Sequence, residues 1–196
     1  MNDDGSIIDY FGGLNDLNNK VLKHTSHAFA DDPVRILRTC RFAARYYDLG
    51  FKIHEETMIL MVDMINKGLF DNVKPERIML ELRKGLMEKN PQVMLVEMNN
   101  CGILKKVMPE IDVLFENKEI ISNVLSEMKK TSDLNLIFEE RYACLINNIG
   151  VGDNTTLKQV EDLNKKLKVT KFESKLSRLV MIYHKIINNF KSVDTV

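Results

Sequence analysis

Four arginines recur at helical spacing near the start of this chain, in the segment DDPVRILRTCRFAAR that spans 31–45. At about 100° per residue, their side chains fall within a sector of roughly 120° of a helix surface. The arginines are Arg35, Arg38, Arg41 and Arg45, and the residues opposite them are Ile36, Leu37, Cys40, Ala43, Ala44 and Tyr47. An arginine binds a phosphate through two parallel hydrogen bonds or donates to the edge of a base. The spacing therefore predicts a helix with one packed face and one basic face suited to a phosphate or a nucleotide.

The residues before these arginines are typical of a helix start. Asp31 or Asp32 can cap an N-terminus and Pro33 suits the first turn, so we expect the helix to begin within two residues of Pro33. A solvated amphipathic helix is the alternative, because charged residues usually lie on exposed faces. However, Arg41 and Arg45 form a like-charged pair four residues apart, which costs about a few tenths of a kcal/mol in an isolated helix. An anionic ligand would remove that cost.

This segment resembles the nucleotide-recognition helix of the CCA-adding tRNA nucleotidyltransferases and the related bacterial poly(A) polymerases. The family pattern is approximately E-D-P-x-R-x-x-R-x-x-R-F, and this chain departs from it only in having Asp31 for the glutamate. The upstream stretch DDGSIIDYFGGLNDL resembles the family's D-x-x-G-x-I-I-D-P-F-x-G-x-x-D-L, with Tyr10 for the proline. The similarity continues in order through GFKIHEET, KPERIMLELRKGL and KNPQVMLVEMNNCGILKKVMPEIDVLF.

The resemblance implies a protein template that selects CTP and ATP. Cytosine and adenine present an amino donor beside a ring-nitrogen acceptor, whereas guanine and uracil present a carbonyl beside a ring N–H. By similarity, Asp32 accepts from the amino group and Arg35 donates to the ring nitrogen or carbonyl. Arg38 resembles the arginine that approaches the triphosphate, and Arg41 serves either the nucleotide or neighbouring carboxylates. These four residues are the predicted nucleotide-binding set.

The motifs of the family's catalytic head are missing from the 196 residues. The head carries a G-G-x-x-R-D turn and a D-x-D pair that holds two divalent metals, and neither pattern occurs here. We therefore expect no catalytic residue and no metal site in this chain, with Mg²⁺ needed only where a head is supplied in cis or in trans. Met1 stands where the family has an internal methionine, which favours a C-terminal portion of a longer enzyme. Such a portion should be inactive alone.

The function implied is tRNA 3′-end processing, by the neck and body of an enzyme that adds C and A to the tRNA terminus. Two alternatives remain open at this point. A bacterial poly(A) polymerase shares the Asp-Arg helix, and a separate or decayed RNA-binding chain would need no nucleotide at all.

Periodicity and helix breakers predict a mainly α fold, a helical bundle preceded by a short strand remnant of an α/β head. The expected regions are the end of the head over 1–30, a neck and body over 31–115, and a helical tail over 116–196. The strand is expected over 6–11, and the helices over 33–48, 55–67, 75–88, 91–101, 118–130, 138–147, 156–167 and 171–189. Most methionines fall at apolar helical positions, where methionine fills core gaps.

The tail resembles a metal-dependent phosphohydrolase domain that some bacterial members carry. Their R-F-A-x-L-x-H-D-x-G-K-G corresponds here to RYACLINNIGVG, which places Asn147 and Asn148 at the His-Asp pair. Asparagine amides are poor ligands for divalent metals, and His184 is the only histidine after His54. The tail is expected to be a degenerate, metal-free version of that domain, or else an unrelated helical segment.

The charges balance overall, with 28 basic and 28 acidic residues, but two segments are locally basic. These are 20–52 and 158–191, for which RNA backbone contact and ordinary solvation of helices are both consistent. The three cysteines are isolated and form no C-x-x-C, which excludes a disulfide framework. No apolar stretch reaches the length of about 18 residues needed to span a bilayer, so we expect a cytoplasmic protein without a membrane partner.

Overall fold

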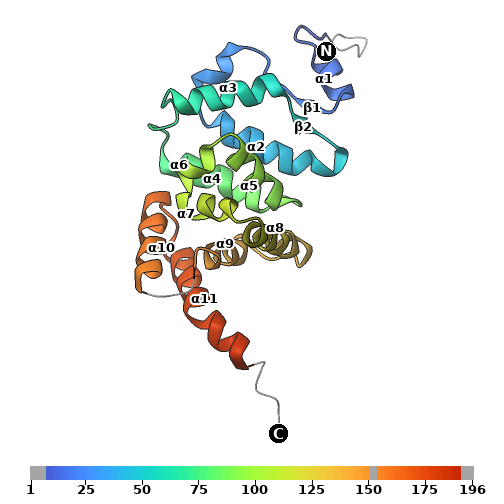
Figure 1. Cartoon of the computed structure of the whole chain (residues 1–196). Coiled ribbons are helices and arrows are strands. Elements are labelled where there is room, and N and C mark those ends of the chain that lie inside the picture. The colour runs from blue at the N-terminus through green and yellow to red at the C-terminus, as the bar shows by residue number, and fades with distance from the viewer. Residues whose placement is uncertain (1–7, 151–153, 191–196) are drawn as a thin grey trace.

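A computed structural model of the chain describes residues 8–150 and 154–190 (Figure 1). Its α-helices are α1 (Gly13–Asn18), α2 (Arg35–Tyr46), α3 (Glu55–Asn66), α4 (Pro75–Leu86), α5 (Pro91–Asn100), α6 (Ile103–Val107), α7 (Pro109–Asp112), α8 (Lys118–Asp133), α9 (Phe138–Asn147), α10 (Asn154–Leu167) and α11 (Lys171–Phe190). Three short 3-10 helices are η1 (His27–Asp31), η2 (Tyr47–Leu49) and η3 (Val113–Glu116). The mainly α fold predicted from the sequence is confirmed. None of the helices in the described ranges has both the length and the apolar content required to cross a bilayer.

The only sheet within the described ranges has two strands of two residues each. β1 (Val21–Leu22) and β2 (Lys52–Ile53) pair in parallel, with Val21 opposite Lys52 and Leu22 opposite Ile53. The strand expected over 6–11 is wrong at residues 8–11, and its first two residues lie outside the described ranges. Asp9 instead accepts hydrogen bonds from the backbone N–H groups of Gly13 (2.8 Å) and Leu14 (2.9 Å), which fixes the start of α1.

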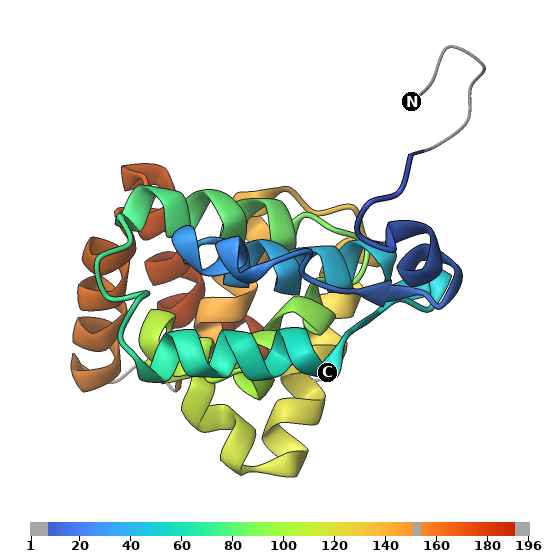
Figure 2. The same cartoon turned by 90° about the horizontal axis from the view of Figure 1, so that it is seen from above.

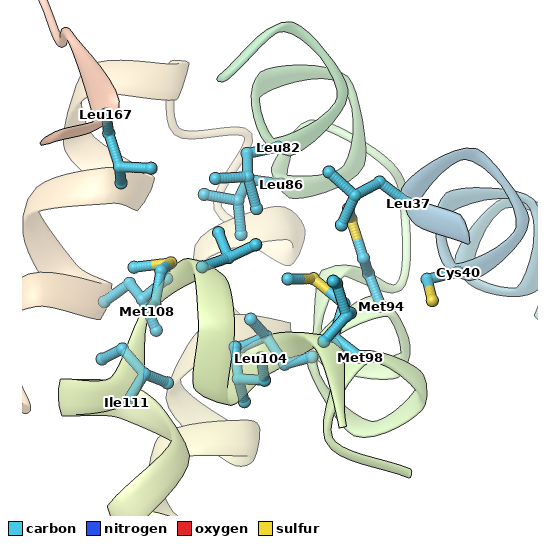
Figure 3. Packing of buried hydrophobic residues seen from close by; sticks show 14 of the residues in the cluster. Leu37, Cys40, Leu82, Leu86, Met94, Met98, Leu104, Met108, Ile111 and Leu167 are labelled. Carbon is cyan, nitrogen blue, oxygen red and sulfur yellow. The ribbon is translucent and has the colours of Figure 1, made fainter. Parts of the chain in front are cut away.

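Helix α2 lies at the centre of the neck and body. Viewed from above, it runs between α3 and α4 (Figure 2). It packs against both α4 and α5, while α9 packs against α8 and α11. Leu37 and Cys40 of α2 meet leucines of α4 and methionines of α5 in one buried cluster (Figure 3). The face of α2 that packs in the core is therefore the apolar face predicted to lie opposite the arginines.

The buried cluster is continuous from the neck into the tail. It contains Met61, Met64, Met79, Met94 and Met98, which confirms the prediction that these methionines fill the core. It also includes Leu167 and Met181, so it crosses the boundary predicted between 31–115 and 116–196. The two predicted regions therefore share one core, and the boundary between them stays a prediction.

The close approach of α4 and α5 depends on a glycine within α4. A Cβ atom built on Gly85 would stand 1.8 Å from the sulfur of Met94, far inside any contact distance. No larger residue fits unless Met94 moves, although alanine is ordinarily the better helix former. Gly85 therefore sets the spacing of the two helices that support α2.

Candidate functional site

The start of α2 is the first part of the candidate nucleotide site. The helix begins at Arg35, two residues after Pro33, which confirms the predicted start. The Asp32 backbone carbonyl accepts from the N–H of Arg35 at 2.9 Å, and its Oδ1 accepts from the N–H of Val34 at 3.3 Å. Asp32 therefore closes the turn that leads into the helix, and its carboxylate lies beside the first arginine.

The second carboxylate oxygen of Asp32 is held by an arginine from a different helix. Oδ2 accepts a hydrogen bond from Nη2 of Arg77 in α4 at 2.8 Å. This bond holds the pKa of the Asp32 carboxyl below its ordinary value, against the opposing effect of partial burial. Asp32 is consequently an ionised acceptor at neutral pH, and its side chain is still 27% exposed. The sequence analysis missed Arg77, because 45 residues separate it from Asp32.

The first two arginines of α2, Arg35 and Arg38, line an open pocket. Arg35 donates from Nη1 to the backbone carbonyl of Ala28 in η1. The Arg38 side chain is 46% exposed, and its Nη2 lies 3.6 Å from Oε1 of Glu81. The pocket beside them has a volume of about 500 Å³ and lies between α2, the segment that leads into η1, and Thr57 of α3. Its size falls within the usual range for small-molecule sites.

The opposite wall of this pocket is polar and aromatic. Lys23, His24 and Phe29 line it, together with Phe42 from α2. The ring Nδ1 of His24 lies 2.9 Å from Oγ1 of Thr57, and its backbone N–H donates to the same oxygen at 3.0 Å. The wall is thus fixed to α3. It combines apolar rings with cations, which are the features that hold a base and a phosphate together.

Arg41 pairs with carboxylates of the fold. Its side chain is buried, with Nε donating to Oε2 of Glu81 at 2.8 Å and Nη1 lying 3.7 Å from Glu88. Its guanidinium also stands 4.4 Å from the centre of the Phe42 ring. The repulsion expected between Arg41 and Arg45 is therefore offset by the carboxylates of Glu81 in α4 and Glu88 just after it. These carboxylates are distant in the sequence, so they do not occur three or four positions from Arg41 in its own helix.

One residue of the predicted packed face lies elsewhere. Tyr47 is 53% exposed, so its assignment to the buried side of the helix is wrong. The α-helix ends at Tyr46, and Tyr47 begins the 3-10 helix η2. A change from 3.6 to about three residues per turn rotates the side chains that follow, and the helical projection no longer holds.

The two tail positions compared with a His-Asp pair differ in their contacts: Asn148 is hydrogen-bonded, whereas the buried Oδ1 of Asn147 has no hydrogen-bond partner within the described residues. Asn148 donates from Nδ2 to Oε2 of Glu127 in α8 at 2.8 Å and to the carbonyl of Cys144 at 2.9 Å. His184 lies on α11, with its Nδ1 3.2 Å from the carbonyl oxygen of Met181. Among the described residues, no group of three or more histidine, cysteine or carboxylate side chains is placed to hold a metal ion. The residues present here do not fit a metal-dependent phosphohydrolase site.

Comparison with known proteins places this arrangement in a family context. Residues 50–115 match the family described as "Probable RNA and SrmB- binding site of polymerase A". The multifunctional CCA protein of Neisseria gonorrhoeae (strain NCCP11945) is 40% identical over 207 residues, which cover 94% of this chain and 50% of that protein. This chain spans about half the length of the curated relatives that it matches.

Solved structures agree with the sequence matches. The Thermotoga maritima CCA-adding enzyme complexed with tRNA is 25% identical, with a TM-score of 0.68, over 94% of this chain and 44% of that chain. A CCA-adding enzyme in complex with ATP is 26% identical, with a TM-score of 0.64, over 96% of this chain and 44% of that chain. The chain is therefore related to the CCA-adding enzymes over nearly its whole length, and the resemblance drawn from its motifs is confirmed.

Proposed function

We propose that this chain supplies the nucleotide-recognition and RNA-binding part of an enzyme that adds C and A to the 3′ end of tRNA. The observation that carries the proposal is the pair formed by Asp32 and Arg35 at the start of α2. Arg35 lines the pocket of about 500 Å³, and Asp32, three residues before it, presents a partly exposed, ionised carboxylate just before the start of the helix.

The chemistry of this pair favours two of the four bases. A carboxylate accepts from the amino group of cytosine or adenine, and the guanidinium donates to the adjacent ring nitrogen or carbonyl. Guanine and uracil present a carbonyl and a ring N–H at those places, so both contacts become mismatched. A well-placed bidentate contact discriminates by about 1–3 kcal/mol. Arg77 supports the selection, because its hydrogen bond holds the Asp32 carboxylate in place and lowers the pKa of that carboxyl.

The remaining arginines divide into two roles in this proposal. Arg38 is exposed and lies at the pocket, where it can neutralise the triphosphate. Arg41 is buried against Glu81, so we assign it to positioning the helix rather than to contacting the nucleotide. The nucleotide-binding set therefore consists of Asp32, Arg35 and Arg38, with Arg41 acting through its carboxylate partner.

Nucleotide transfer needs groups that the residues of this chain do not provide. The sequence contains neither a D-x-D pair nor a G-G-x-x-R-D turn, and no described cluster is placed to hold a metal. We therefore propose that the chain is inactive alone and works with a catalytic domain, supplied in cis or in trans, that brings Mg²⁺. Names among its relatives that mention tRNA, ATP and CTP support these substrates.

The test is nucleotide binding by the chain itself, measured for ATP, CTP, GTP and UTP by saturation-transfer NMR. We expect a preference for ATP and CTP that is lost in Asp32→Asn and in Arg35→Ala. Arg45→Ala is the matched control, because Arg45 is an exposed arginine of the same helix that does not line the pocket. An unchanged preference in the Asp32 and Arg35 variants would overturn the template.

The second candidate, part of a poly(A) polymerase, is favoured by the description of the matching family. The same titrations separate the two, because a polymerase that adds only A has no use for CTP. Binding of ATP without CTP would support that candidate. Absence of binding by any nucleotide would instead favour a chain that contacts RNA alone.

A further inference from the structure

A groove between α10 and α11 lies outside the nucleotide site and carries concentrated positive charge. It encloses about 470 Å³ and is lined by twelve residues, of which five are basic and one is acidic. The basic residues are Lys165, Lys168, Lys171, Lys175 and Arg178, and the acidic residue is Glu161. The groove is therefore strongly cationic, although the whole chain is neutral.

The floor of the groove is rigid and internally satisfied. Asn164 is buried, accepts from the hydroxyl of Tyr142 at 2.7 Å, and donates to Ser174 and Ser177 at 3.3 Å. These bonds tie α9, α10 and α11 together beneath the cations. Because the floor groups have partners within the fold, the rim supplies the binding capacity.

Two rim lysines carry the argument. Lys171 and Lys175 are exposed and form no ion pair within the described residues, whereas Lys165, Lys168 and Arg178 each have a carboxylate within 3.8 Å. The two lie four residues apart at the start of α11, where like charges repel and a cation opposes the helix dipole. Their placement is unfavourable for the helix, and an anion bound in the groove would offset that cost.

The backbone at the entrance to the groove is also unusual. Lys168 has φ of 52°, a left-handed conformation that glycine adopts more readily. Its side chain reaches Glu76 of α4 at 2.6 Å, which fixes the turn between α10 and α11 against the neck. The groove is therefore held in place relative to α4 and, through α4, to the recognition helix.

The position of the groove selects the kind of anion. Helices α10 and α11, which enclose the groove, lie toward the other end of the molecule from β1 and β2 (Figure 1). The groove and the nucleotide pocket share no lining residue, so the ligand that contacts both places is an extended polyanion. We propose that the groove between α10 and α11 binds the phosphodiester backbone of the RNA substrate through Lys171 and Lys175, an inference that rests on the proposed function.

The test compares two double variants of the whole chain for binding to a fluorescent RNA hairpin with a single-stranded 3′ tail. Anisotropy titrations at several KCl concentrations give the dissociation constant and its dependence on salt. For Lys171→Ala/Lys175→Ala, we expect binding weakened about tenfold and a salt slope reduced by roughly 1 to 2, as for the loss of one or two phosphate contacts. The matched control is Lys118→Ala/Lys130→Ala, which removes the same charge from two exposed, unpaired lysines of α8.

Each outcome bears on a single claim. Equal weakening by both double variants would show a general effect of net charge and would overturn the groove. Displacement of the RNA by inorganic phosphate, beyond the effect of matched KCl, would assign the groove to a small anion instead. The preference for ATP and CTP should be unchanged in the Lys171/Lys175 variant, so failure of the groove is distinguishable from failure of the nucleotide template.

Discussion

Arg41 of α2 donates from Nε to Oε2 of Glu81 in α4 at 2.8 Å, and both side chains are buried. The other oxygen of Glu81 lies 3.6 Å from Arg38, which faces the pocket. One buried carboxylate therefore fixes the recognition helix to its support and also orients an exposed arginine of the site.

Removal of the Glu81 carboxylate should be costly. Glu81→Ala leaves the Arg41 guanidinium buried with only Glu88, at 3.7 Å, as a charged partner. We expect the free energy of unfolding to fall by about 3 kcal/mol, at the low end for a broken buried pair because Glu88 remains. Urea denaturation measures this change. In the double variant Glu81→Ala/Arg41→Met the loss should be smaller than the sum of the losses in Glu81→Ala and Arg41→Met, and simple additivity would contradict the pairing.

The charge on Asp32 should depend on Arg77. The hydrogen bond from Arg77 is the main cause of the lowered pKa of Asp32. Since the folded pKa lies below the ordinary aspartate value of 3.8, the pair stabilises the fold at pH values above 3.8, and the contribution is lost as pH falls through the folded pKa. In Arg77→Met, the pKa of Asp32 should rise toward 3.8, as followed by carboxyl ¹³C NMR titration. An unchanged titration would show that Arg77 does not hold the carboxylate.

Gly85 should tolerate no side chain. Alanine within a helix ordinarily stabilises by up to about 1 kcal/mol relative to glycine, but here its Cβ would overlap the sulfur of Met94. We expect Gly85→Ala to destabilise the fold by about 1–3 kcal/mol. Gly13→Ala is the control, because its Cβ would meet only Asp9 at 3.7 Å, an ordinary contact. Replacing Met94 with alanine in the Gly85→Ala background should recover part of the loss in thermal unfolding experiments.

The tail should contribute to the stability of the neck through Arg141. This buried guanidinium donates to the backbone carbonyls of Leu86 and Glu88, at 2.8 and 3.1 Å, and to that of Leu136 at 2.8 Å. Arg141→Met leaves these carbonyls without that donor, and a buried unsatisfied group costs about 1–3 kcal/mol. We expect destabilisation of about 2–4 kcal/mol. Arg141→Lys should recover little of it, since an ammonium group lacks the planar fork.

Local pattern predicted the helices and the basic face of α2 well, because periodicity and capping act over a few residues. The partners of those side chains were not predictable in the same way. Glu81 lies 40 residues from Arg41, and only the packing of α2 on α4 brings the two together. Arg77 belongs to the KPERIMLELRKGL segment, yet nothing in that segment indicates which carboxylate the arginine contacts.

Short elements escaped prediction for a different reason. β1 and β2 have two residues each, too few for an alternating pattern. In the sequence they are separated by α2, so their pairing is not a local feature. The prediction for Tyr47 was wrong because the α-helix ends at Tyr46 and the 3-10 helix η2 begins at Tyr47. The apolar spacing predicted the tail helices. It did not predict the groove between α10 and α11, because a helical projection shows the faces of one helix but not which helix packs beside it.

Helix α4 is fastened on both of its sides. Arg77 and Glu81 hold the recognition helix, while Glu76 and Arg83 pair with Lys168 and Glu173 of the tail. Helix α4 thus joins the tail helices to α2 and to the segment that carries Asp32. A change in the tail that breaks its contacts with Glu76 and Arg83 would therefore be transmitted through α4 to the start of α2.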